Sequence, residues 1–164
     1  MPIAITRAVS SALVRCELTY LPRVSIDLAR ARLQHRAYEQ VLRDEGYVVE
    51  QLAADEDLPD CVFVEDAAIV FDECAVIARP GAESRRPEVP VVASAVARYR
   101  PIHIIQPPGT LDGGDVLVVG RAVFVGRSNR TNREAILQMQ RILTPHGYSV
   151  REVTVRGCLH LKSA

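Results

Sequence analysis

The chain has 164 residues, of which 48% are hydrophobic and 24% are charged, and its 20 basic residues are balanced by 20 acidic residues. That length can bury one sizeable core, and a net charge of zero argues against a basic surface for nucleic acid or anionic membranes. Residues 1–10 lack the long apolar core of a signal peptide, and no stretch is apolar over the length of a membrane span. We therefore expect a cytoplasmic protein of the mixed α/β class with neither nucleic-acid nor membrane partners.

The first predicted elements are a strand at residues 3–6, a helix over residues 26–45 and a strand at residues 47–52. Gly46 follows the helix, as is typical of a helix C-terminus. Four apolar side chains recur at helical spacing within this stretch: Ile26, Leu33, Ala37 and Val41. This spacing predicts that they form one face that packs on a sheet.

Two hairpins follow, each made of two apolar runs separated by a short turn signal, which is Asp72-Glu73 in the first and Gly120-Arg121 in the second. The hairpin strands are expected at residues 67–71 and 74–78, and at residues 116–119 and 123–125. The helices and closing strands are expected at residues 90–99 and 102–105, and at residues 131–146 and 148–153. The order strand, strand, helix, strand thus occurs twice.

This pattern predicts a single α/β domain over residues 1–164, with repeats at about residues 1–52, 60–106 and 110–155. A fourth unit would begin at residue 157, with a strand over residues 158–163. That strand has no following hairpin with which to pair, so it would leave an exposed edge. We therefore expect these residues to be the first portion of something longer.

Chemically useful side chains recur in step with these repeats. Glu65 and Asp66 stand at the start of the first hairpin and Asp112 stands at the start of the second, while His160 belongs to the following unit. Asp112 lies 47 residues after Glu65, and His160 lies 48 residues after Asp112. A protein built of structural repeats would deliver side chains at such even steps to one place.

Five stretches together carry a family resemblance: LPDCVFVEDAAIV, ARPGAESRR, PPGTLDGGDVLVVG, VGRSNRTN and LHLKS. In this order and at these spacings, the chain resembles the dimethylarginine dimethylaminohydrolases of the guanidine-modifying pentein superfamily over essentially all of its residues. The resemblance implies an α/β propeller of five ββαβ units around a central pocket, of which this chain would hold about three. It also implies hydrolysis of asymmetric dimethylarginine to citrulline and dimethylamine through a cysteine thiolate, expected beyond residue 164.

A pocket for a guanidinium needs carboxylates in one plane, because the cation is flat and presents its N–H donors in a fork. Asp66 and Asp112 meet this requirement, and the resemblance places both against the guanidinium nitrogens with Glu65 as a supporting carboxylate. Each aspartate could instead cap a turn, as aspartate often does. The repeat register and the downstream histidine favour the pocket.

His160 is the candidate general acid and base, because imidazole titrates near neutral pH and can donate a proton to a departing amine. We expect it on the strand at residues 158–163, with Cys158 and Lys162 on the same face. A nucleophile should approach the substrate from another direction than the acid, so Cys158 is a poor candidate for that role.

The other cysteines, Cys16, Cys61 and Cys74, are expected to be buried free thiols. The four cysteines lack C-x-x-C spacing and a nearby pair of histidines, so the sequence suggests neither a metal site nor a disulfide framework. We expect no cofactor.

The amino-acid end of the substrate calls for opposite charges. The resemblance assigns Arg85 and Arg130 to the substrate carboxylate, and Asp60 with the backbone of Leu18 to the ammonium, on an early loop that would act as a lid. Phe63 would wall the pocket. Taken alone, each arginine is more typical of a solvated surface position, but its place in the ESRR or RSNRTN motif favours the binding role.

Two alternatives stay open. Arginine deiminases resemble this chain but place an acidic residue two positions after the catalytic histidine, where this sequence has Lys162, which favours a methylated substrate. The chain could also be an inactive remnant that binds arginine-like ligands, or half of a split enzyme completed by another polypeptide. A homodimer is expected only by analogy with bacterial relatives.

Overall fold

The structure is a computed structural model that describes all of residues 1–164. It contains two compact units, Met1–Val64 and Glu65–Ala164, each of which combines helices and strands. None of its helices is both long enough and apolar enough to cross a membrane.

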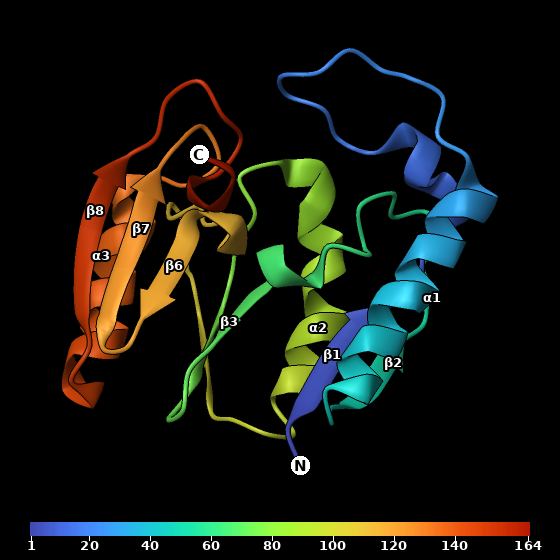
Figure 1. The fold of residues 1–164 in the computed structure, drawn as a ribbon. Coiled ribbons are helices and arrows are strands. Elements are labelled where there is room, and N and C mark those ends of the chain that lie inside the picture. The colour runs from blue at the N-terminus through green and yellow to red at the C-terminus, as the bar shows by residue number, and fades with distance from the viewer. The chain divides into compact units, whose positions relative to one another are not determined.

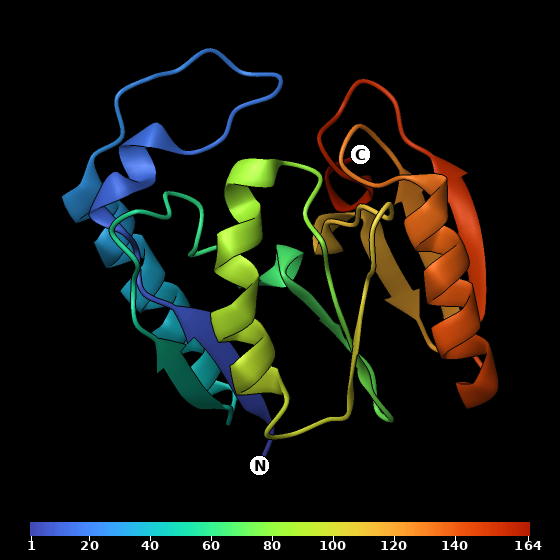
Figure 2. The same cartoon turned by 180° about the vertical axis from the view of Figure 1, so that it is seen from behind.

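In the first unit, β1 (Ile3–Arg7) runs parallel to β2 (Val48–Leu52). The chain between them forms a short 3-10 helix, η1 (Ser11–Arg15), and then α1 (Leu28–Asp44). Figure 1 shows α1 lying over one face of the strand pair, and Figure 2 shows the pair from its other face. The strand, helix and strand of this unit therefore appear in the order that the sequence predicts.

Local signals fix both ends of α1. The Asp27 carboxylate accepts a hydrogen bond from the Arg30 N–H at 3.0 Å, which satisfies one of the unpaired donors of the first turn. Beyond the last turn, Gly46 adopts a φ of 85°, a conformation that glycine reaches without steric cost.

The inner face of α1 differs from the one that the apolar spacing predicts. Three of the four predicted residues are exposed: Leu33, Ala37 and Val41. The buried face carries Glu39, only 3% exposed, whose carboxylate accepts hydrogen bonds from Thr6 Oγ1 and Gln51 Nε2, both at 2.6 Å. The prediction was wrong because polar partners on β1 and β2 can satisfy a buried acid, and apolar spacing contains no information about them.

The second unit begins with one ββαβ repeat. β3 (Ala68–Val70) pairs antiparallel with β4 (Ala75–Ile77), which pairs parallel with β5 (Ile102–Ile104). Between β4 and β5 the chain forms a 3-10 helix, η3 (Glu83–Glu88), that runs directly into α2 (Val89–Val96). The strand order in this sheet is β3-β4-β5.

The next repeat has the same connectivity. β6 (Val116–Val119) pairs antiparallel with β7 (Ala122–Arg127), and β7 pairs parallel with β8 (Ser149–Thr154). α3 (Arg133–Leu143) and the short η5 (Thr144–His146) connect β7 to β8. The strand order is β6-β7-β8, so the predicted ββαβ arrangement is present in both repeats.

One apolar core joins the two repeats of this unit. It combines residues of β3 and β4, and Ile105 directly after β5, with residues of β6, β7 and α3. Its fully buried members include Val76, Ile105, Val123 and Met139. Because side chains in a close-packed core cannot move independently, this core fixes the turns at the ends of its strands relative to one another.

The C-terminal segment is not the strand that the sequence predicts. After Gly157, whose φ is 74°, the chain bends and ends in the 3-10 helix η6 (Leu161–Ser163), with His160 as its N-cap. The Leu161 N–H donates to Asp115 Oδ1 at 3.0 Å, and the His160 N–H donates to Ser163 Oγ at 3.1 Å. The prediction was wrong because these backbone groups find side-chain partners and need no neighbouring strand.

Candidate active site

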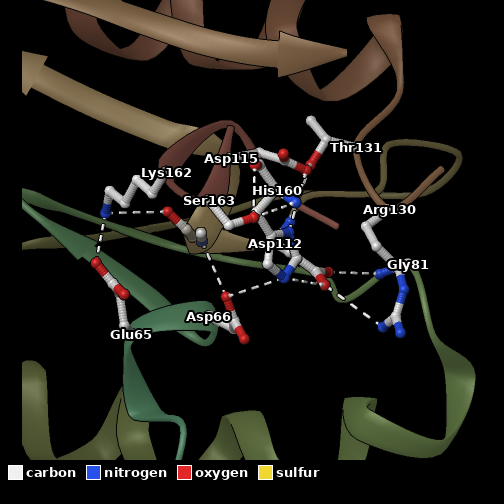
Figure 3. Close-up of polar contacts among 12 residues, drawn as sticks. Glu65, Asp66, Gly81, Asp112, Asp115, Arg130, Thr131, His160, Lys162 and Ser163 are labelled. Atoms are coloured by element: carbon white, nitrogen blue, oxygen red, sulfur yellow. Dashed lines mark hydrogen bonds and ion pairs between the residues drawn. The ribbon is translucent and has the colours of Figure 1, made fainter. Parts of the chain in front are cut away.

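Short 3-10 turns place the side chains that the sequence singles out. VED forms η2 (Val64–Asp66), GGD forms η4 (Gly113–Asp115), and η6 follows His160 directly. Figure 3 shows the side chains of Asp66, Asp112 and His160 directed towards one another. The structure therefore brings these three residues together.

Two glycines permit this close approach. A Cβ atom at Gly113 would overlap the carbonyl oxygen of Glu65, and one at Gly114 would lie 2.8 Å from the ring of His160. The Gly114 N–H donates to Asp66 Oδ1 at 2.9 Å. Glycine at these positions lets one turn pack its backbone directly against the other two.

His160 faces carboxylates on both sides of its ring. Its Nε2 lies 3.9 Å from Asp66 Oδ1 and 4.0 Å from Asp112 Oδ2, while its Nδ1 lies 3.6 Å from Asp115 Oδ2. Burial of the ring opposes protonation, but the three carboxylates outweigh it, so the pKa of His160 is raised above its usual value. The imidazole can therefore hold a proton on Nε2 between Asp66 and Asp112.

Asp115 is a member of this site that the sequence reasoning missed. It is fully buried, and its Oδ2 accepts hydrogen bonds from Ser128 Oγ at 2.6 Å and from Thr131 Oγ1 at 2.7 Å. Burial alone would raise the pKa of its carboxyl, but His160 and these hydroxyl and backbone donors lower it, so Asp115 is held as an anion. Its only signal in the sequence is its place at the end of the LDGGD motif.

Asp112 is buried and is less completely neutralised. Its Oδ1 accepts a hydrogen bond from the Gly81 N–H at 2.9 Å, whereas its Oδ2 accepts none and lies 3.6 Å from Arg130 Nη1. Burial and the charge of Asp66 raise the pKa of Asp112 in spite of the Gly81 N–H and Arg130. Its anionic form would be stabilised by a further positive group beside Oδ2.

Arg85 forms ion pairs with two acidic side chains. Its Nη1 lies 2.6 Å from Asp66 Oδ2, and its Nη2 lies 2.9 Å from Glu88 Oε2. Desolvation lowers the pKa of the guanidinium, but Glu88 and Asp66 more than compensate, so the pKa of Arg85 is raised. The predicted contacts of Arg85 and Arg130 with a substrate carboxylate stay predictions, and Glu88 is a second acid that the sequence reasoning did not include.

Glu65 lies outside this buried group. Its side chain is 65% exposed and forms an ion pair with Lys162 Nζ, which also donates to the Gly113 carbonyl oxygen at 3.3 Å. Figure 3 shows this pair on the opposite side of Asp66 from Arg130. Glu65 thus positions Lys162 over the η4 turn, and its predicted support of the guanidinium remains a prediction.

The remaining predicted residues lie in the first unit. Asp60 is buried, and its Oδ2 accepts a hydrogen bond from the Glu17 N–H at 2.9 Å. Leu18 and Phe63 are 39% and 49% exposed, so neither belongs to the core of that unit. Their roles in binding the amino-acid end of a substrate stay predictions.

The donor atoms of Asp66, Asp112 and His160 lie within 4.8 Å of one another, so this set could also hold a divalent cation. All four cysteines are free thiols, and Cys158 Sγ donates to the His160 carbonyl oxygen at 3.6 Å. That contact directs the Cys158 sulfur to the backbone.

The repeated ββαβ units and the cluster of carboxylates around one imidazole define a pentein-type α/β protein. Residues 55–162 match the family model described as arginine deiminase, so the chain belongs to the arginine deiminase family. Its predicted resemblance to dimethylarginine dimethylaminohydrolases is confirmed by relatives of that name.

One such relative, from Streptomyces coelicolor, is 43% identical over 162 residues, which cover 98% of this chain and 63% of the relative. Another, from Pseudomonas aeruginosa, is 42% identical over 139 residues, which cover 84% of this chain and 55% of the relative. A solved structure of the P. aeruginosa enzyme, a cysteine-to-serine variant complexed with citrulline, matches with a TM-score of 0.91 at 40% identity, covering 96% of this chain and 62% of that one. The chain thus spans about three-fifths of the length of these relatives.

Proposed function

We propose that the protein to which these residues belong hydrolyses asymmetric N-methylated arginine to citrulline and dimethylamine. The observation that carries this proposal is an excess of buried negative charge in the second unit. Four buried carboxylates, Asp66, Glu88, Asp112 and Asp115, are accompanied by only two buried guanidinium groups, Arg85 and Arg130, and by the imidazole of His160. Buried charge requires partners, so the cluster favours a cationic ligand.

The shape of the cluster favours a guanidinium among cations. Asp66 and Asp112 come from successive repeats and approach His160 Nε2 from two sides, at 3.9 and 4.0 Å. A flat cation with forked N–H donors can bond two carboxylates at once, whereas an ammonium cannot match both in one plane. Asp112 Oδ2, which accepts no hydrogen bond from the protein, is the acceptor available to it.

The chemical step needs a thiolate that attacks the guanidinium carbon. As the tetrahedral adduct collapses, the bond from carbon to the dimethylamine nitrogen breaks, and His160 Nε2 gives that nitrogen a proton. Water, deprotonated by the same imidazole, then attacks the carbon, the carbon–sulfur bond breaks, and citrulline and the thiolate are released. Asp66 and Asp112 hold the carbon in place through its nitrogen substituents.

Asp115 has a positioning role in this scheme. Its carboxylate faces His160 Nδ1 and is itself held by Ser128 and Thr131, so it fixes the ring with Nε2 directed at the substrate. It also stabilises the imidazolium that must donate the proton. Asp115 therefore acts through His160 and does not contact the substrate.

We assign the nucleophile to a cysteine outside residues 1–164, in keeping with the relatives, of which this chain spans about three-fifths. Cys158, the cysteine nearest in sequence to His160, donates to a backbone carbonyl, and Cys74 belongs to the core of the second unit. At the other end of the substrate, Arg85 and Arg130 would hold the carboxylate, and Asp60 with the Leu18 backbone would hold the ammonium, with Phe63 beside them.

An arginine deiminase activity on unmethylated substrate is the second candidate, since the family model carries that description. Lys162 argues against it. Lys162 stands two positions after His160, where such enzymes have a carboxylate, and its ammonium is paired with Glu65. A cation at that point disfavours an additional N–H donor on the substrate and is compatible with methyl groups.

The test is to measure citrulline formed from asymmetric dimethylarginine and from arginine by this chain, alone and joined to the sequence encoded after it. We expect turnover of the methylated substrate only by the longer product, and loss of that turnover in Asp66→Asn. Asp72→Asn, which alters an exposed acid of the same repeat, is the matched control and should leave turnover unchanged. Turnover by residues 1–164 alone would refute the assigned nucleophile, and preferred turnover of arginine would favour the deiminase.

A further inference from the structure

A second group of metal-binding side chains lies away from the acidic cluster, in the same unit. Cys74, His103 and His146 offer one sulfur and two ring nitrogens that all lie within 4.8 Å of one another. None of the three side chains forms a hydrogen bond or an ion pair. They lie 29 and 43 residues apart in the sequence, so no spacing motif reveals them.

The sheet register explains why two of them share a face. Val76 of β4 pairs with His103 of β5, and partners across a parallel pair point to the same side. Cys74 precedes Val76 by two residues and therefore points to that side as well. The third ligand, His146, ends η5 of the next repeat, directly before Gly147 with its φ of 80°.

Hydrogen bonds connect the two repeats next to these residues. Glu73, next to Cys74, accepts hydrogen bonds from Arg121 Nη1 at 2.6 Å and from Tyr148 Oη at 2.9 Å. The same Arg121 nitrogen donates to the His146 carbonyl oxygen at 3.1 Å. The backbone segments that carry Cys74 and His146 are therefore held together by contacts that do not involve the three ligand atoms.

This ligand set selects a particular class of metal. One thiolate and two imidazoles suit borderline-soft divalent ions, Zn²⁺ above all, and not Mg²⁺ or Ca²⁺, which prefer oxygen. A tetrahedral Zn²⁺ with Zn–S of about 2.3 Å and Zn–N of about 2.0 Å places its ligand atoms roughly 3.3 to 3.6 Å apart. Side-chain movements of about 1 Å would bring the three ligand atoms to that separation, and a water molecule would be the fourth ligand of the tetrahedral ion.

The three side chains differ in their exposure to solvent. Cys74 is 1% exposed and sits at the edge of the core, so its sulfur is shielded from solvent, while His103 is exposed and His146 is half-buried. Metal can therefore enter from the histidine side. The thiol would lose its proton to solvent as the metal–sulfur bond forms, with no oxidation or reduction.

We propose that Cys74, His103 and His146 bind one Zn²⁺ or a similar divalent transition-metal ion, which links β4 and β5 of one repeat to η5 of the next. The site is independent of the proposed hydrolase function, because it shares no residue with the acidic cluster around His160. Its expected consequence is a metal-dependent increase in the stability of the second unit.

The test uses the reduced, chelator-treated chain of 164 residues and Co²⁺ as a spectroscopic substitute for Zn²⁺. We expect a thiolate-to-Co²⁺ charge-transfer band in the near ultraviolet that saturates at one ion per chain and disappears when Zn²⁺ is added. His103→Ala, at an exposed position that should not affect folding, should weaken Co²⁺ binding at least about tenfold. Cys74→Ser should remove the band.

Two controls separate this site from the acidic cluster, whose oxygen and nitrogen atoms could also hold a cation. Cys158→Ser removes the thiol nearest in sequence to His160, and His160→Ala removes the imidazole of that cluster. Both should leave the charge-transfer band unchanged. Absence of the band at saturating Co²⁺, its survival in both Cys74→Ser and His103→Ala, or its loss in Cys158→Ser would overturn the proposal.

Discussion

The two ββαβ repeats of the second unit each direct an aspartate towards His160, but they neutralise it differently. In the first, Asp66 lies 2.6 Å from Arg85, which is also bound by Glu88. In the second, Asp112 is more deeply buried and lies 3.6 Å from Arg130. The first repeat thus contains a closed network of charges, whereas the second leaves a carboxylate oxygen available, and the imidazole lies between them.

This difference assigns different tasks to the two aspartates. Asp66 is held by its own arginine, so its position is set before any ligand binds. Asp112 has a raised pKa because burial and Asp66 outweigh the Gly81 N–H and Arg130, so its charge depends on what lies beside Oδ2. Each repeat therefore supplies one aspartate to the site, and the local partners give Asp66 a fixed position and make the charge of Asp112 depend on its surroundings.

The largest effect should come from Arg85→Ala, because it leaves Asp66 and Glu88 without their shared buried counter-ion. We expect the free energy of unfolding to fall by about 3–5 kcal/mol, as for other broken buried pairs. Arg130→Ala, with its longer contact, should cost about 1–2 kcal/mol. Urea unfolding followed by circular dichroism measures both, and equal losses would contradict the contrast between the repeats.

Arg86→Ala provides the control for these variants. Arg86 pairs with Glu83, whose side chain is 83% exposed, so the loss should be about 0–1 kcal/mol.

Asp115→Asn should lower the turnover number of the complete enzyme by about 10²-fold, because His160 loses both its orientation and the charge that favours its imidazolium. The Michaelis constant should change little, since Asp115 does not face the substrate. The pKa of His160, followed by NMR in the 164-residue chain, should fall. An unchanged His160 pKa together with full activity would show that Asp115 only supports the fold.

Asp112→Asn should slightly stabilise the chain at neutral pH, by about 1 kcal/mol, because the buried charge disappears. The pKa of Asp112 is raised in the folded state, so its contribution to stability is present below the unfolded pKa and is lost as pH rises through the folded pKa. The advantage of the asparagine variant should therefore vanish at acidic pH. Unfolding free energies measured across that pH range test this, and a pH-independent difference would contradict it.

The smallest effect concerns His160. Its pKa is raised by Asp115, Asp66 and Asp112 in spite of burial, so it stabilises the fold at pH values below its unfolded pKa of about 6.5. That contribution is lost as pH rises through the raised folded pKa. The difference in unfolding free energy between the wild type and His160→Gln should decrease as pH rises from the unfolded to the folded pKa of His160. This pH range should be narrower in the Asp115→Asn background, because that variant lacks one of the carboxylates that raise the folded pKa.

Much of the architecture could be predicted from the sequence because local signals specify it. Alternating apolar runs around Asp72-Glu73 and Gly120-Arg121 predicted both hairpins of the second unit, which β3-β4 and β6-β7 confirm. The site was predicted in part: nearly even spacing in repeats predicted that Asp66, Asp112 and His160 converge. Asp115 was missed because its importance lies in contacts with Ser128, Thr131 and His160, which only the folded chain brings together.

The sequence by itself determined the two ββαβ units and the approximate positions of the chemical groups, because strand and helix periodicity are local properties of the chain. Only the tertiary structure decided which face of α1 is buried, that residues 158–163 turn instead of extending, and that Cys74 meets His103 and His146. These features depend on hydrogen-bond partners and packing neighbours that are distant in sequence, and local sequence patterns do not identify such partners.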